Sequence, residues 1–236
     1  MERNNRSGQI IAIVALVASA VGISLGFAAF SNTLTIQSSA EIKPANFDVD
    51  FSIDSSTQTD ANGKTIGKEG TVKGTPTPAP EVGSQFAAAD ATISNASAGA
   101  PVISGLHATF TAPGQSVTYS FKAINVGELD AFLRQVNFAQ ASATCTAKAG
   151  STPEDQATPA LVTAACADMS LSVKVGTSTY TATNSNITSH SLAVGASEDV
   201  VVTMTYADNG HRVDGDVDVT FGDVTLVYNS ADGTGA

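Results

Sequence analysis

The hydrophobic pattern of most of the chain is that of β-strands with one buried face. Segment 47–53 shows it clearly, because apolar and polar residues alternate strictly along it. The apolar members are Phe47, Val49, Phe51 and Ile53, and the polar members are Asp48, Asp50 and Ser52. A period of two places alternate residues on opposite faces of a strand. The segment is therefore predicted to be a half-buried strand with one apolar and one acidic face.

The same alternation predicts further strands along the rest of the chain. They are 30–37, 103–110, 117–123, 132–138, 169–175, 192–194, 200–206, 217–221 and 224–228. Apolar parity flips across Gly222-Asp223, which favours a β-bulge there, because a bulge inserts one extra residue. Asn125-Val126-Gly127-Glu128 is predicted to be a turn, since Asn and Gly tolerate positive φ.

Segment 54–85 interrupts the pattern and is predicted to be a spacer or loop. It is rich in Ser, Thr and Gly and leads into the proline-rich run 75–80, where prolines favour locally extended backbone. Because it contains few apolar residues, it is not expected to order itself by burying its own surface.

These elements predict an all-β protein, a jelly-roll or immunoglobulin-like β-sandwich. About nine short strands separated by Gly, Pro and Asn turns are typical of that architecture. The first strands are expected in 29–53 and the main sandwich domain in 86–229, with a flexible tail at 230–236.

The first 28 residues are predicted to be a signal peptide or a membrane anchor. Two arginines precede the uncharged apolar run 10–27, and the small residues Ala28 and Ala29 follow it. This order is typical of a secretory signal processed at Ala28 and Ala29. The same run is about long enough to cross a bilayer uncleaved. A third alternative is a pilin-type signal cut after Gly8. We therefore expect the protein outside the cytoplasm, secreted from or displayed on a bacterium.

The charge balance excludes one class of partner. The chain has 22 Asp and Glu residues against 11 Lys and Arg, a net charge of −11. An acidic chain without a basic patch repels nucleic-acid phosphates, so nucleic-acid binding is excluded.

Cys145 and Cys166 are the two cysteines of the chain and are predicted to form a disulfide, because exported proteins fold in an oxidising compartment. Two thiols with no histidine nearby in sequence are too few ligands for a metal site. Between them, Thr152-Pro153 and Thr158-Pro159 are both typical of helix starts, with an N-cap followed by proline, and predict one or two short helical turns.

Two motifs resemble the TasA/camelysin group of exported Gram-positive proteins. The segment 28–32, Ala-Ala-Phe-Ser-Asn, is similar to the signal-peptide exit of that group, although Asn32 stands where the group often has Asp. Segment 113–127 resembles the group's hairpin, which opens on Pro-Gly and closes on Asn-x-Gly. As a whole, the chain is most similar to small exported members with paired cysteines. The resemblance implies secretion, a jelly-roll-like sandwich and, as in the best-known members, assembly into extracellular biofilm fibres.

Cleavage after Ala28 would leave Ala29–Gln37 as a free, alternating strand. A free strand can pair with an exposed sheet edge of the next subunit, and this head-to-tail contact builds a fibre. Phe30, Leu34 and Ile36 would then form the strand-addition interface. The alternative is that this strand pairs within its own sandwich.

No catalytic constellation is recognisable, so the chain is predicted to be no enzyme and to use no cofactor. The three histidines are far apart and lie in no His-Glu-x-x-His motif, and no G-x-S-x-G elbow is present. No resident metal is predicted. Asp214, Asp216 and Asp218 alternate and offer hard oxygens to calcium, but their order differs from an EF-hand loop, which favours a solvated acidic face.

Together these features predict a non-enzymatic surface or matrix protein, most concretely a fibre subunit that self-associates by strand addition. The first alternative is a monomeric binding or adhesion module tethered to the membrane by an uncleaved helix. The second is a pilin-like subunit that retains its N-terminal helix. Other cell-surface proteins are the remaining expected partners.

Overall fold

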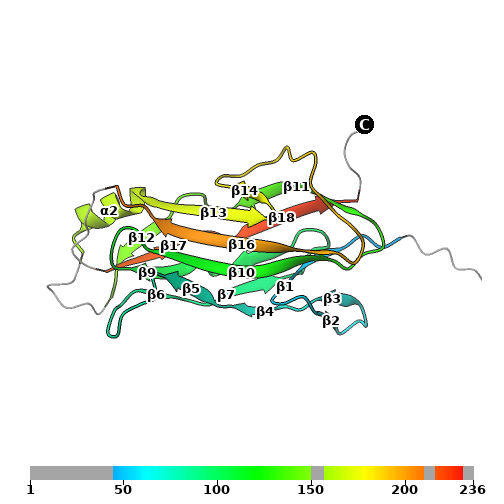
Figure 1. Cartoon of the computed structure of the whole chain (residues 1–236), viewed down its shortest axis with the longest axis horizontal. Helices are drawn as coiled ribbons and strands as arrows, with labels where there is room; N and C mark the ends of the chain where they lie inside the picture. The colour runs from blue at the N-terminus through cyan, green and yellow to red at the C-terminus, as the bar shows by residue number, and fades with distance from the viewer. Residues whose placement is uncertain (1–44, 150–156, 210–215, 231–236) are drawn as a thin grey trace, which may run out of the picture. The chain divides into compact units, whose positions relative to one another are not determined.

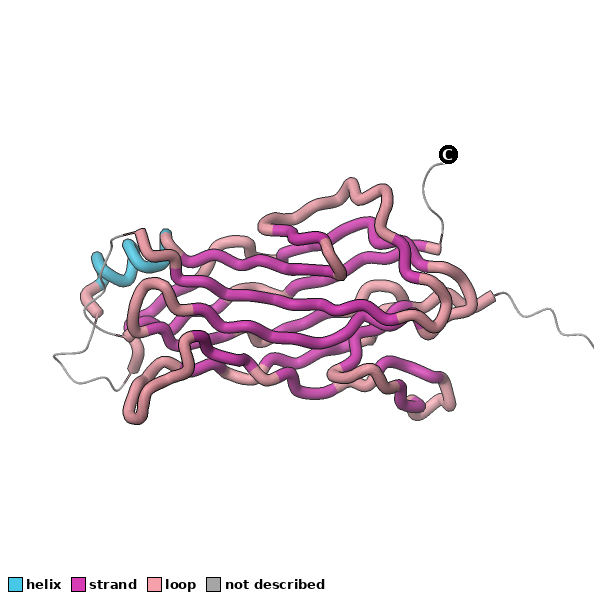
Figure 2. The backbone as a smooth tube through the Cα atoms, in the orientation of Figure 1, coloured by secondary structure: helices cyan, strands magenta, loops and turns pink. Residues whose placement is uncertain are grey.

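In the computed structural model, described for residues 45–149, 157–209 and 216–230, nearly every regular element is a β-strand (Figure 2). The exception within these ranges is the helix α2 (Pro159–Ala167). The all-β class predicted from the sequence is therefore confirmed.

Several predicted features fall outside the described residues. They are the signal or anchor at 1–28, the strand at 30–37, the helix start at Thr152-Pro153 and all but the first residue of the tail at 230–236. Within the described part of the chain, no helix is long and apolar enough to cross a membrane.

The first layer is an antiparallel sheet centred on two ten-residue strands, β10 and β16. Its spatial order is β1 (Val49–Ser52), β10 (Ser116–Asn125), β16 (Ser197–Tyr206), β13 (Met169–Val175), β14 (Ser178–Tyr180). A sixth strand, β5 (Gly74–Thr77), pairs with β10 on the same side as β1, nearer its start. Strict alternation along β10 and β16 turns every second side chain into the core, as predicted.

The second layer consists of two antiparallel sheets, and the chain passes from one to the other more than once. One has the order β15 (Ser191–Leu192), β11 (Ala131–Phe138), β18 (Val224–Asn229), β8 (Val102–Ser104), β7 (Ala91–Ser94), β4 (Gly70–Val72). The other has the order β12 (Thr144–Ala147), β17 (Val217–Thr220), β9 (His107–Phe110), β6 (Ala87–Ala88). The chain passes directly from β8 to β9 and from β17 to β18, and both sheets lie behind the first layer in Figure 1.

The hydrophobic core lies between these layers and draws on both. Tyr206 of β16 and Phe110 of β9 are fully buried and meet edge to face, with ring centroids 6.2 Å apart at 84°. Phe51 and Phe121 meet similarly at 4.7 Å. Each such pair contributes about 0.5–1.5 kcal/mol beyond the area it buries.

Segment 54–85 is not the spacer that its composition predicts. It contains four strands, namely β4, β5 and the hairpin of β2 (Thr57–Thr59) and β3 (Thr65–Gly67). The reason is pairing with distant strands: β4 bonds to β7 and β5 bonds to β10. Backbone hydrogen bonds need no apolar side chains, so a polar segment becomes ordered when neighbouring strands offer an edge. The proline-rich run is extended as predicted, with Pro76 opposite Val117.

The half-burial predicted for segment 47–53 is also wrong, because its acidic face is covered. Strand β1 is buried on both faces, and Asp48, Asp50 and Ser52 are at most 1% exposed. The alternation correctly predicts a strand, but it carries no information on what covers the polar face. Here the β2–β3 hairpin does so.

The parity flip at Gly222-Asp223 is real, but it is not a one-residue bulge. Residues 221–223 separate β17 from β18, which belong to different sheets. Apolar residues on both sides of the break are buried. A Cβ at Gly222 would lie 2.6 Å from the Cβ of Gln140, so a residue without a side chain is needed at this crossing.

Candidate functional site

Strand β13 leaves one edge of the first layer open along its N-terminal half. Strand β14 pairs with β13 only at Val173–Val175. Residues Met169–Ser172 therefore have β16 on one side and, among the described residues, no strand on the other. This open edge leaves backbone groups of the first layer available to another strand.

Hydrogen-bond parity shows which backbone groups the open edge presents. Just before β13, Asp168 O accepts a bond of 2.9 Å from Ala207 N–H, so the even-numbered residues of β13 bond to β16. The N–H and C=O of Leu171 therefore point to the open side, because bonded and non-bonded pairs alternate in antiparallel sheets. The side chain of Leu171 packs into the core, at 3% exposure, while Ser170 is exposed.

The opposite edge of the same sheet is closed. The side chain of Asn95 accepts a hydrogen bond from Phe51 N–H at 2.7 Å and donates one to Phe51 O at 2.8 Å. Ile53 N–H donates to Lys68 O at 3.0 Å. The outward backbone groups of Phe51 and the N–H of Ile53, just after β1, are thus occupied, as natural proteins commonly arrange for edge strands. By contrast, no described strand pairs with the outer side of Met169–Ser172 in β13.

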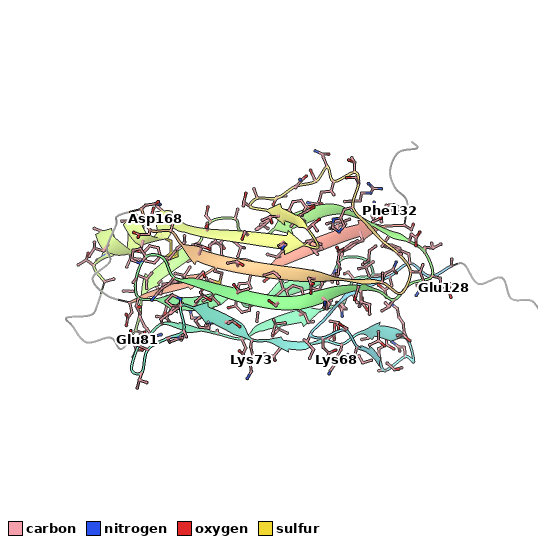
Figure 3. The ribbon with its side chains drawn as sticks, viewed as in Figure 1. Lys68, Lys73, Glu81, Glu128, Phe132 and Asp168 are labelled. Carbon is pink, nitrogen blue, oxygen red and sulfur yellow. A yellow bond between two sulfur atoms is a disulfide. The ribbon has the colours of Figure 1, made fainter. Side chains whose placement is uncertain are left out.

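The predicted disulfide is present and lies beside this edge. Cys145 of β12 and Cys166 of α2 are bonded across a sequence separation of 21 residues. The predicted helix start is also confirmed, because Thr158 is the N-cap and its side chain accepts from Leu161 N–H. Helix α2 passes into β13 at Asp168, which Figure 3 labels at this junction. The disulfide therefore ties the element that leads into the open edge to the second layer.

Most of the other residues singled out in the sequence lie outside the described part of the chain. Ala28, Ala29, Phe30, Leu34 and Ile36, the processing and strand-addition residues, all lie outside the described ranges.

Only part of the calcium candidate, Asp214, Asp216 and Asp218, lies in the described ranges. Asp214 lies outside the described ranges. Asp218 Oδ1 accepts from Thr109 Oγ1 at 2.6 Å and pairs with Lys148 Nζ at 3.3 Å. A lysine thus already supplies positive charge at Asp218. Across the described ranges, no group of three His, Cys, Asp or Glu side chains is placed to hold a metal ion.

A polar network that the sequence did not reveal joins His190, Glu198 and Tyr228. One oxygen of Glu198 lies 2.6 Å from His190 Nε2, and the other accepts from the Tyr228 hydroxyl at 3.0 Å. Burial, reinforced by the Glu198 charge, raises the pKa of Tyr228 well above its usual value. The network links the segment before β15 to β16 and β18, and its three members come from separate parts of the chain.

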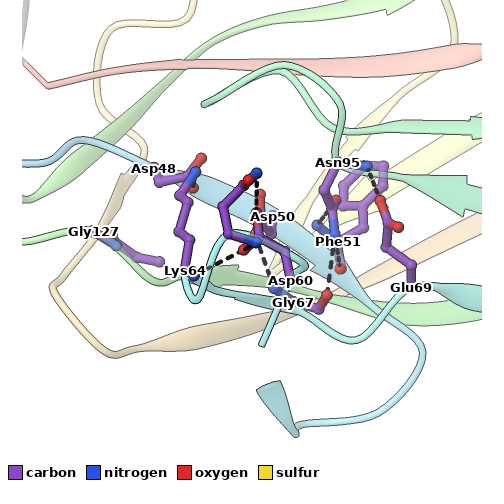
Figure 4. Close-up of polar contacts among 11 residues, drawn as sticks. Asp48, Asp50, Phe51, Asp60, Lys64, Gly67, Glu69, Asn95 and Gly127 are labelled. Atoms are coloured by element: carbon purple, nitrogen blue, oxygen red, sulfur yellow. Dashed lines mark hydrogen bonds and ion pairs between the residues drawn. The ribbon is translucent and has the colours of Figure 1, made fainter. Parts of the chain in front are cut away.

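A second group missed from the sequence surrounds the buried carboxyl groups of Asp48 and Asp50 (Figure 4). Lys64 Nζ forms an ion pair with Asp48 Oδ2, and Gly67 N–H donates to Asp50 Oδ2 at 2.8 Å. Asp48 Oδ1 and Asp50 Oδ1 accept no hydrogen bond from any described residue.

The turn after β10 lies against the backbone of Asp48. Val126 N–H and Gly127 N–H both donate to Asp48 O, at 3.2 and 3.1 Å. A Cβ at Gly127 would lie 2.6 Å from Asp48 N, so close approach of the two backbones requires glycine. The chain bends at 127–129, between β10 and β11, as predicted, but Gly127 is needed for this close approach and does not adopt a positive φ.

The environment of Asp50 favours its neutral form. Burial raises the pKa of this carboxyl from 3.8 to about 6, and the Gly67 N–H bond opposes the rise while the Asp48 charge adds to it. Lys64 shows the complementary effect, because its contact with Asp48 raises its pKa above 10.5.

Comparison with known proteins adds no family to these observations. No protein-family model matches the chain, and neither curated proteins nor solved structures include a match.

Proposed function

We propose that the chain is a non-enzymatic, exported structural protein of a bacterial surface or matrix, and a fibre subunit assembled by strand addition. The sandwich in this proposal is of the jelly-roll kind that the TasA/camelysin resemblance implies. The observation that carries the proposal is the open edge of β13, where Leu171 offers its N–H and C=O outward.

In this proposal the donor is Ala29–Gln37 of the next copy, freed by cleavage after Ala28. The donor's apolar residues Phe30, Leu34 and Ile36 share one parity, as do the inward residues of β13. A strand pairing with β13 would thus extend both the backbone ladder and the apolar face. Because donor and acceptor are different surfaces, the contact is head-to-tail and does not close.

The donor side is tested by electron microscopy of protein that starts at Ala29. Leu34→Asp is expected to abolish filaments, because a carboxylate would face the core of the neighbour. Thr35→Asp is the matched control, since it adds the same charge at the opposite parity and is expected to leave assembly intact. Equal assembly by both variants would refute the donor strand.

The acceptor side is tested at Leu171. Leu171→Pro removes both the leucine side chain and the outward N–H. Leu171→Ala also removes the leucine side chain, but it keeps that N–H. Filaments are expected for Leu171→Ala and not for Leu171→Pro, provided that circular dichroism shows both variants folded. Filaments of normal length from folded Leu171→Pro would place the interface elsewhere.

A membrane-tethered monomer is the second candidate, favoured by the apolar run 10–27. The N-terminal sequence of protein recovered from the native surface separates the two. A start at Ala29 supports the fibre, a start at Met1 in the membrane fraction supports the tethered module, and a start at Gln9 supports a pilin-like subunit.

A further inference from the structure

We propose that Lys64 and Asp48 condense into an isopeptide bond, which fastens the β2–β3 hairpin covalently to the start of β1. The two side chains already meet: Lys64 Nζ lies against Asp48 Oδ2. The Asp48 side chain is 0% exposed, whereas the stem of Lys64 is partly exposed, so the amine reaches inward from the hairpin (Figure 4).

The contact differs from an ordinary surface salt bridge in the burial of its carboxyl group. Asp48 Oδ1 has no hydrogen-bond partner in the described structure, and Oδ2 is contacted by Lys64 Nζ. A buried carboxylate normally has its lone pairs satisfied. Here the amine is held against a carboxyl group that is incompletely partnered, so the two groups that would form the amide already lie together.

The backbone around both reactants is fixed. Asp60 Oδ1 accepts from Lys64 N–H at 2.8 Å, and Lys64 O accepts from Asp60 N–H at 2.9 Å. Asp48 is held by the two bonds from Val126 and Gly127 described above. Holding two reactants in contact replaces a bimolecular encounter with an intramolecular step, which is worth orders of magnitude in rate.

Asp50 is placed to handle the protons. It lies next to Asp48 and Lys64, and the charges of both act on it. Its raised pKa means that it carries a proton more readily than an exposed aspartate, and Asp50 Oδ1 is unpartnered. It can therefore act as a general acid–base group for its neighbours.

The reaction needs no oxidant, reductant or further co-reactant. It proceeds from the neutral amine and the neutral acid, whose formation from the ion pair is a proton transfer that a desolvated site assists. The Lys64 nitrogen forms a bond to Asp48 Cγ, one C–O bond of Asp48 breaks, and Asp50 relays the amine proton to the departing oxygen. One water molecule leaves. Because Asp48 raises the pKa of Lys64, the neutral amine is the minority form, and the bond is expected to form slowly after folding.

The test is the mass of the purified full chain after denaturation, reduction and alkylation. After allowance for any N-terminal cleavage, the expected mass is that of the sequence less one water molecule. Trypsin should fail to cut after Lys64, because an acylated lysine is no substrate. Chymotrypsin cleavage after Phe51 should leave the segments containing Asp48 and Lys64 joined.

Lys64→Arg is the matched control, since it keeps the positive charge but cannot form the amide. It is expected to show the full mass of its own sequence. Loss of water at Asp-Gly pairs, such as Asp214-Gly215, would also occur in this variant, and its product is cleaved by hydroxylamine. The isopeptide bond would be absent from this variant and resists hydroxylamine. Full mass in the wild type, with tryptic cleavage after Lys64, would overturn the proposal.

A second variant tests the proton relay. Asp50→Asn keeps the size of the side chain and is expected to retain the fold while slowing bond formation at least tenfold in a time course after refolding. An unchanged rate would remove Asp50 from the mechanism.

Discussion

At the scale of single residues, the β2–β3 hairpin buries Asp48, just before β1, and Asp50, within it, and this burial sets the protonation of Asp50. Asp50 is 1% exposed and its pKa is raised to about 6, so the folded protein holds a proton that the unfolded chain releases near pH 4. Protonation of Asp50 therefore favours the folded state. Exposed aspartates with hydrogen-bonded carboxylates, such as Asp54 and Asp60, have lowered pKa values and favour folding at higher pH.

Asp50→Asn isolates the contribution of this group when both proteins carry Lys64→Arg, which keeps the charge and cannot form the amide. Relative to the variant, the protein that retains Asp50 is expected to gain stability as pH falls from about 7 to about 4, by up to about 3 kcal/mol, since one pKa unit corresponds to ~1.4 kcal/mol. The measurement is urea denaturation of both proteins at pH 4, 5.5, 7 and 8. A difference between them that does not change with pH would contradict the buried, neutral-prone carboxyl.

Gly127→Ala tests the close approach of the turn to segment 45–48. A Cβ there would collide with backbone atoms of Asp48 and Asn46, and backbone cannot rotate away as a side chain can. We expect a loss of about 1–3 kcal/mol, the usual cost of overpacking. Thermal unfolding measures it, and an unchanged Tm would show that the turn can move.

At the scale of elements, the sequence was informative where a strand's own side chains decide its position. The alternation along β10, β13 and β16, the helix start at Thr158 and the disulfide were all predicted correctly. Segment 54–85 was not, because its strands are held by backbone bonds to β7 and β10, far away in sequence. The open edge of β13 was equally out of reach, since it depends on where the short strand β14 ends.

Amide hydrogen exchange checks the correction for segment 54–85. The amides of residues 70–77 that bond to β7 and β10 are expected to exchange slowly, with protection similar to their partner strands. Residues 79–85, which form no strand, serve as the internal control and should exchange quickly. Fast exchange throughout 54–85 would restore the spacer interpretation.

Removal of the disulfide tests the link between α2 and β12. With Cys145 and Cys166 both replaced by serine, we expect a loss of about 3 kcal/mol, because the unfolded chain regains the freedom of the closed loop. Chemical denaturation of the variant against the oxidised wild type measures this loss. No change in stability would show that packing of Val162 and Ala165 alone holds the helix.

At the scale of the whole molecule, closed and open edges together favour head-to-tail assembly. The sheet is sealed at β1 by Asn95 and by the hairpin, while β13 keeps backbone donors and acceptors facing outward. A receptive edge at β13 and a strand donated by the next copy would be the two unlike surfaces that an open, non-closing polymer requires.

The most direct test compares two forms of the protein by electron microscopy under identical conditions. One starts at Ala29 and the other starts after Gln37. The account predicts filaments from the first form and only monomers from the second, with both equally folded. Filaments from both forms, or monomers from both, would contradict assembly through the N-terminal strand.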